Sequence, residues 1–141
     1  MRKFEIVCPI RKANPYRRMA KATKEHRVYP NSFNHKFKQE IPKKVLLTDI
    51  TYIKYGVAQT AYLSTIKDAS TNVIFAYNIS DSIDLLIATE TIDKLVATHK
   101  RTLHKDAFIH LDQGFHYTSP KFQELLKTNN LGQSMSRHGN C

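Results

Sequence analysis

The chain has 141 residues, 41% of them hydrophobic, which is enough for one packed domain and too little for two. Its two cysteines, Cys8 and Cys141, lie at opposite ends, which excludes a disulfide framework and indicates a reducing, cytoplasmic location. The first residues carry no long apolar run, so the sequence predicts neither a signal peptide nor a membrane span.

The net charge of +10 is concentrated in the first third of the chain. Residues 1–44 hold 13 Lys and Arg against three acids, whereas residues 45–141 hold nine of each sign. We therefore expect a basic arm over 1–44 and a core domain over 45–141. Such an arm indicates an acidic partner, with nucleic acid first and a membrane surface second. The alternative is a basic face kept for solubility.

Asn14-Pro15 predicts the start of a basic helix over residues 16–26. Its apolar residues are too few to bury much surface, so it suits a phosphate backbone better than a core. Arg17, Arg18 and Lys21 are the candidate DNA contacts of this segment.

From Val45 the pattern predicts three strands joined by short turns, at 45–53, 61–66 and 73–79. From residue 82 the apolar period becomes helical. A strand ending at Asp112, a helix from Ser119 to about Asn129 and a short strand at 131–136 follow. The order βββαβαβ indicates an α/β (or α+β) fold with a mixed sheet. The helix predicted from residue 82 is expected to carry on one face Leu85, Thr89, Ile92, Leu95, Val96 and His99.

Asp112 follows the apolar run 107–109, and Gly114 breaks the strand behind it. Ser119-Pro120 then opens a helix, with an N-cap hydroxyl before a Pro at the first helical position. Asp112 is thus expected where a central strand ends, which is where open α/β sheets collect functional groups. The alternative is an ordinary Asp-Gln-Gly turn.

Asp49 stands in mid-strand among apolar residues, where a buried carboxylate normally needs a partner. That partner could be the hydroxyl of Thr48 or Thr51. Should the strand of Asp49 neighbour the strand of Asp112, the two carboxylates would instead converge as oxygen ligands for Mg²⁺. Paired ions of this kind clamp the attacking and leaving oxygens of a phosphodiester displacement.

Four segments, 47–53, 62–68, 110–119 and 133–141, together resemble the catalytic region of insertion-sequence transposases of the retroviral-integrase-like group. The resemblance implies a ribonuclease H-like fold and metal-dependent DNA cleavage and strand transfer. It makes Asp49 and Asp112 the first two acids of an Asp-Asp-Glu triad. Both would bind Mg²⁺, with Mn²⁺ as a substitute, and the protein would act on DNA, in a complex of several copies.

The family's Glu lies on a helix beyond the Gly-Asn-Cys motif, and this chain ends at Cys141. Glu124 is expected to be a solvated helix residue instead. We therefore expect a C-terminally truncated piece of a Mg²⁺-dependent transposase. Two alternatives stay open, namely a non-catalytic DNA-binding remnant and a ribonuclease H-type nuclease.

Polar residues around these motifs are candidates for contacts with the DNA backbone, because they would lie near the metal. The alternative for each is a solvated loop position. His110 and His116 flank Asp112, but their spacing fits no zinc signature. The candidates are Gln113, His116, Ser136 and Arg137.

Overall fold

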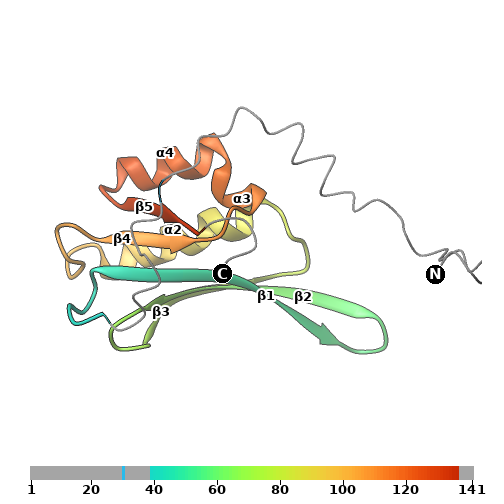
Figure 1. Ribbon diagram of the computed structural model, residues 1–141. Helices are drawn as coiled ribbons and strands as arrows, with labels where there is room; N and C mark the ends of the chain where they lie inside the picture. Colours follow the sequence, from blue (N-terminus) through green and yellow to red (C-terminus); the bar gives the residue numbers. More distant parts are fainter. Residues whose placement is uncertain (1–29, 31–38, 137–141) are drawn as a thin grey trace, which may run out of the picture.

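The computed structural model describes Pro30 and residues 39–136, and these form a five-stranded mixed sheet with helices on one face (Figure 1). The strands lie in the order β3-β2-β1-β4-β5. The elements in chain order are β1 (Val45–Tyr55), β2 (Gln59–Asp68), β3 (Ile74–Ser80), α2 (Leu85–His99), β4 (Phe108–Leu111), α3 (Phe115–Thr118), α4 (Pro120–Thr128) and β5 (Gly132–Met135).

The first three strands form the predicted antiparallel meander. Gly56 makes the first turn with φ +57°, a left-handed conformation that glycine adopts without steric cost. β4 and β5 then join in parallel, so that β1 pairs with β2 on one side and β4 on the other. This mixed topology confirms the ribonuclease H-like architecture expected from the sequence.

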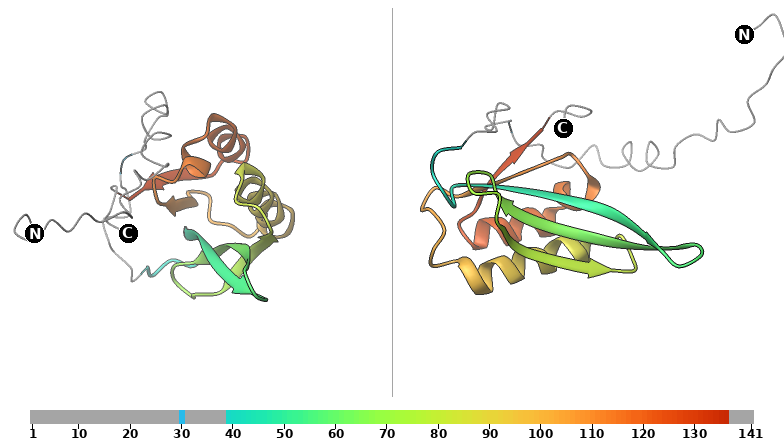
Figure 2. Two further views of the ribbon diagram at one scale, coloured as in Figure 1. Left: turned by 90° about the vertical axis from the view of Figure 1, so that its right-hand side faces the viewer. Right: turned by 90° about the horizontal axis from the view of Figure 1, so that it is seen from below.

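All described helices cover one face of the sheet, as the view along the strands in Figure 2 makes plain. Asp84 begins α2, because its side chain accepts the N–H groups of Leu86 and Ile87. The four-residue helix α3 was not predicted. It fits between Gly114 and Ser119 and is too short to give a periodic signal.

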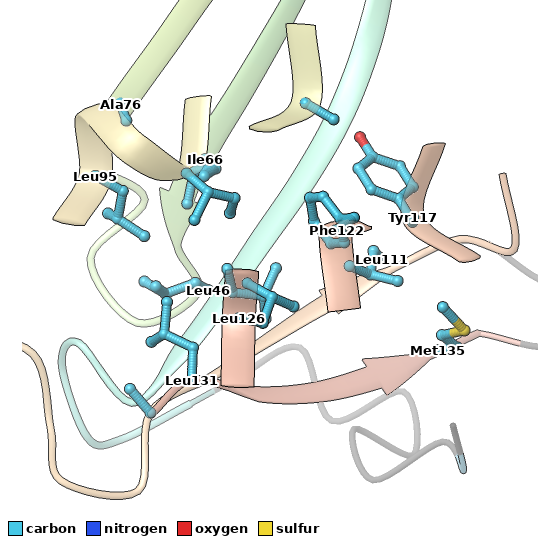
Figure 3. Packing of buried hydrophobic residues seen from close by; sticks show 14 residues of the cluster. Leu46, Ile66, Ala76, Leu95, Leu111, Tyr117, Phe122, Leu126, Leu131 and Met135 are labelled. Carbon is cyan, nitrogen blue, oxygen red and sulfur yellow. The ribbon is translucent and has the colours of Figure 1, made fainter. Parts of the chain in front are cut away.

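The main core lies between this face of the sheet and the helices (Figure 3). Leu46 and Ile66 from the sheet are fully buried against Leu95 of α2 and against Phe122 and Leu126 of α4. Burying side chains of this size contributes about 1.5–3 kcal/mol each. The core therefore holds the sheet against α2 and α4.

The opposite face carries no helix among the described residues. A second, smaller apolar cluster lies there, made by Val45 and Ala69 with Leu47 and Phe108. Beyond it, the hairpin of β1 and β2 extends past the other strands (Figures 1 and 2). Val57 at its tip is fully exposed.

Several predicted features lie outside the described residues, namely the helix at 16–26 with Arg17, Arg18 and Lys21, and also Arg137. The boundary between arm and core at residue 44 stays a prediction. No helix in the described part of the chain is long and apolar enough to cross a bilayer.

Candidate metal centre

Asp112 lies one residue beyond the end of β4 and is exposed. Its Oδ1 accepts the backbone N–H of Gly114 at 2.8 Å, which closes a small side-chain turn. Oδ2 has no hydrogen bond among the described residues. One carboxylate oxygen is therefore held in place while the other stays available to a ligand.

The parallel register of β1 with β4 runs toward Asp49 on one side and Asp112 on the other. Leu47 pairs with His110, and two residues further along each chain stand the two aspartates. Parallel neighbours are about 4.8 Å apart, and residues two apart share a face. Leu47 and Asp49 thus share the face opposite the main core. The pairing shows that β1, which carries Asp49, and β4, which precedes Asp112, are neighbouring strands.

Asp49 is exposed, which corrects the expectation that its carboxylate is buried in mid-strand. β4 pairs with β1 only as far as Leu47, so β1 loses this neighbour before Asp49. No hydrogen bond joins Asp49 to Thr48 or Thr51. The carboxylate faces solvent without a partner in the described part of the chain.

Tyr117 of α3 lies behind both carboxylates. Burial raises the pKa of its hydroxyl, the Thr48 side chain opposes this, and the charges of Asp112 and Asp49 raise the pKa further. The hydroxyl is buried and has no well-formed hydrogen bond with the described residues. The charges of both aspartates therefore contribute to the electrostatic environment of this hydroxyl.

Glycine is required at position 114 because the side chains of Asp112 and Tyr117 lie too close for a Cβ atom. A Cβ at this position would lie 2.9 Å from Asp112 Oδ1 and 3.5 Å from Tyr117 Cδ2. Any side chain would therefore push the carboxylate away from the Gly114 N–H or shift α3. Gly114 adopts φ −61°, so the constraint comes from space and not from backbone strain.

The donor set fits a hard divalent cation. The two exposed carboxylates would supply oxygen ligands and leave room for the waters that Mg²⁺ retains. No group of three His, Cys, Asp or Glu gathers among residues 39–136, so the described part offers two protein ligands. Glu124 is exposed on α4, as the sequence predicted, and belongs to no such group.

The chain leaves β5 beside this pair. The backbone N–H of Ser136 donates to the carbonyl of Leu111 at 2.9 Å, next to Asp112.

Two candidate DNA contacts are buried. His116 is 5% exposed and Ser136 3% exposed, so neither side chain reaches the surface as an ordinary phosphate contact would. His116 faces the start of α2, where burial lowers its pKa and the Ile83 carbonyl, Asp112 and Asp84 oppose that change. Gln113 is half-buried beside Asp112.

The two histidines do not form a metal site together. His110 Nδ1 lies 3.0 Å from Ser134 Oγ on the neighbouring strand. His116 belongs to α3, on the helix side of the sheet.

Sequence reasoning missed the role of Tyr117 and the effect of Thr48 on its hydroxyl. It also missed that the Gly114 N–H holds the Asp112 carboxylate. One signal was present, because Asp followed two residues later by Gly favours a turn in which the carboxylate accepts the glycine N–H. Tyr117 gave no such signal, since its place depends on the docking of α3.

Residues 39–141 match the family model described as integrase core domain. The chain belongs to this family. It is 31% identical over 112 residues to the putative transposase for insertion sequence element IS150 of Escherichia coli, covering 79% of this chain and 38% of that protein. It is 34% identical over 113 residues to the transposase for IS904 of Lactococcus lactis, covering 79% of this chain and 43% of the relative.

Solved integrase and transposase cores share the fold of this integrase-family chain. The simian T-cell lymphotropic virus intasome, solved with a PP2A regulatory subunit, matches with a TM-score of 0.59 and 17% identity, over 80% of this chain and 37% of that chain. The catalytic domain of the Mos1 mariner transposase matches with a TM-score of 0.54 and 13% identity, over 64% and 48%. The chain thus spans well under two thirds of these relatives.

Proposed function

We propose that this chain is the catalytic core of a transposase that cuts DNA at the ends of an insertion sequence and joins the freed end to a target. The observation that supports the proposal is the parallel pairing of β1 with β4, which ends two residues before Asp49 on β1 and two residues before Asp112 after β4. Membership of the integrase core family and similarity to bacterial insertion-sequence transposases support the same reaction. We place this action in the bacterial cytosol, in a complex of several copies on DNA.

In this proposal Asp49 and Asp112 hold Mg²⁺, or Mn²⁺ in its place. A bound ion supplies Lewis-acid stabilisation of the charge that develops on the phosphodiester oxygens. Related cores have been solved with these ions, the integrase core of human T-cell lymphotropic virus 2 with magnesium and the Mos1 core with manganese.

The protein's own residues position the site. The Gly114 N–H fixes Oδ1 of Asp112, so that Oδ2 points to one place. The buried Tyr117 ring backs the pair and keeps water from that side. Water attacks the phosphodiester at the element's end in the first step, and the freed 3′ hydroxyl attacks target DNA in the second. Gln113, beside Asp112, is the described residue that we retain as a DNA contact.

The test uses a transposase that contains this chain and continues through the family's third acid. Asp49→Asn and Asp112→Asn should each abolish Mg²⁺-dependent cleavage of element-end DNA, because Asn keeps the shape and removes the charge that holds the metal. Glu124→Gln is the matched control and should retain activity. Near-normal cleavage by either Asp variant would remove that residue from the site.

A second candidate, a DNA-binding remnant without catalysis, is favoured by one observation. The described residues supply two carboxylates and no third ligand. If residues 1–141 alone bind element-end DNA and do not cut it with Mg²⁺ or Mn²⁺, while the longer protein does, this chain acts as such a remnant when expressed alone. Cleavage without joined product would instead indicate a ribonuclease H-type nuclease.

A further inference from the structure

Charge is divided between the two ends of the sheet. The described residues carry ten Lys and Arg and ten acids, and six of the ten cations lie in three short segments. These segments precede the three parallel strands: residues 43–44 lead into β1, 100–106 into β4 and 127–131 into β5. We call this edge the basic edge; its cations are Lys43, Lys44, Lys100, Arg101, Lys105 and Lys127.

Few acids balance the basic edge. Asp106 is the one acid within its three segments, and it lies 3.9 Å from His104 Nδ1. Asp68 lies close by, but it is fully buried and occupied by the N–H of Lys43 and by Thr71. The remaining described residues hold four cations against nine acids, Asp68 included.

The basic edge is a built surface, because hydrogen bonds join its segments. The N–H of His104 donates to the Lys43 carbonyl at 3.1 Å, and that of Phe108 to the Lys44 carbonyl at 2.9 Å. Lys100 Nζ donates to Asn129 Oδ1 at 3.0 Å and so ties the second segment to the third. The cations are therefore presented together.

The edge with the carboxylates has the opposite charge. Asp49 and Asp112 lie there, and Asp84, which begins α2, lies near Asp112 on the other side of His116. Until a metal binds, this edge repels phosphate. Asp49 lies five positions after Lys44, which is about 16 Å of extended chain, so the two edges are distinct surfaces.

We propose that the basic edge binds the phosphate backbone of duplex DNA without metal and without reading sequence. The proposal rests on the proposed function, which supplies DNA as the partner. Backbone contacts of this kind position DNA and carry no sequence information. The starts of three adjacent strands span about 10 Å, which matches about three base-pair steps of 3.4 Å.

A matched pair of double variants tests this in the full chain. Arg101→Gln with Lys105→Gln removes two cations from the basic edge; both are exposed and make no side-chain hydrogen bond with the described residues. Lys54→Gln with Lys121→Gln removes two exposed cations elsewhere, with the same change in net charge. The probe is a 20-base-pair duplex of arbitrary sequence in EDTA, and the readout is the slope of log K against log salt.

The basic-edge pair should reduce the slope by about 1.8, because each lost phosphate contact removes about 0.9. The control pair should leave it nearly unchanged. Equal slopes in both pairs would overturn the proposal, since net charge alone would then explain binding.

Lysine footprinting of the unaltered chain provides a second measurement that needs no variant. DNA should protect Lys105 and Lys127 from acetylation and leave Lys54 and Lys121 reactive. Uniform reactivity with and without DNA would overturn the proposal. Both assays exclude metal, so their failure is separate from a failure of cleavage, which the element-end assay measures.

Discussion

The two ends of the sheet hold their aspartates in opposite ways. At the end where β1 begins, Asp68 is fully buried and accepts three hydrogen bonds, from Lys43 N at 3.0 Å, Thr71 N at 3.2 Å and Thr71 Oγ1 at 2.8 Å. At the other end, Asp112 is exposed and accepts one bond, and Asp49 accepts none from described residues. The difference teaches that spare acceptor capacity, and not position in a strand, separates an acid that can bind a ligand from one that holds the fold.

Removing the buried acid should cost most. Asp68→Ala leaves the N–H groups of Lys43 and Thr71 without their acceptor, and bonds to a charged acceptor contribute about 1.5–3 kcal/mol each. We expect the free energy of unfolding to fall by about 3 kcal/mol, measured by urea denaturation. Asp81→Ala, which removes one exposed acceptor, is the control and should cost less than about 1 kcal/mol. Equal losses of unfolding free energy in the two variants would contradict the difference between the buried and the exposed aspartates.

The next largest effect is on metal affinity and concerns the Asp112 carboxylate. Gly114→Ala places a Cβ 2.9 Å from Asp112 Oδ1 and displaces the carboxylate from its N–H donor. Losing such a supporting contact lowers metal affinity by about 10- to 100-fold. Calorimetric titration of the transposase with Mn²⁺ would measure this. Gly56→Ala in the remote hairpin turn should leave Mn²⁺ affinity unchanged, although its φ of +57° predicts some loss of stability.

The exposed acid should matter little to the fold. Asp112→Asn removes charge from a solvated site that faces another carboxylate, and we expect the free energy of unfolding to change by less than about 0.5 kcal/mol. The same denaturation experiment as for Asp68 gives the comparison directly. A loss near 3 kcal/mol would mean that Asp112 is a structural acid.

The smallest effect is a pH dependence. Burial lowers the pKa of His116 below 6.5, with the Ile83 carbonyl, Asp112 and Asp84 opposing. The unfolded chain therefore binds this proton more tightly, so the stability from neutral His116 is complete above pH 6.5 and is lost as pH falls. In His116→Gln the free energy of unfolding should depend less on pH between about pH 7 and pH 5 than it does in the unaltered chain.

Sequence patterns predicted the meander, α2, α4 and the order of elements along the chain because alternation and helical period are local properties. Ser119-Pro120 fixed the start of α4, and the structure begins that helix at Pro120. Asp112 was found for the same reason, since a turn residue after an apolar run is visible in sequence. The exposure of Asp49 could not be predicted from the sequence, because it depends on the pairing of β4 with β1 ending at Leu47. The burial of His116 was missed likewise, because it follows from α3 docking against the start of α2.

The pairing of β1 with β4 also sets the order in which the site can assemble. Val45 and Phe108 are 63 positions apart, whereas β1 and β2 meet across a short turn. Loop-closure entropy makes such distant contacts slow to form, so the hairpin has a kinetic advantage over the parallel pair. The β1–β2 hairpin with Asp49 is therefore expected to form first, and β4 pairs with β1 and brings Asp112 later. Divalent ions would therefore favour the last docking step of folding, and Mn²⁺ should slow unfolding more than it speeds refolding.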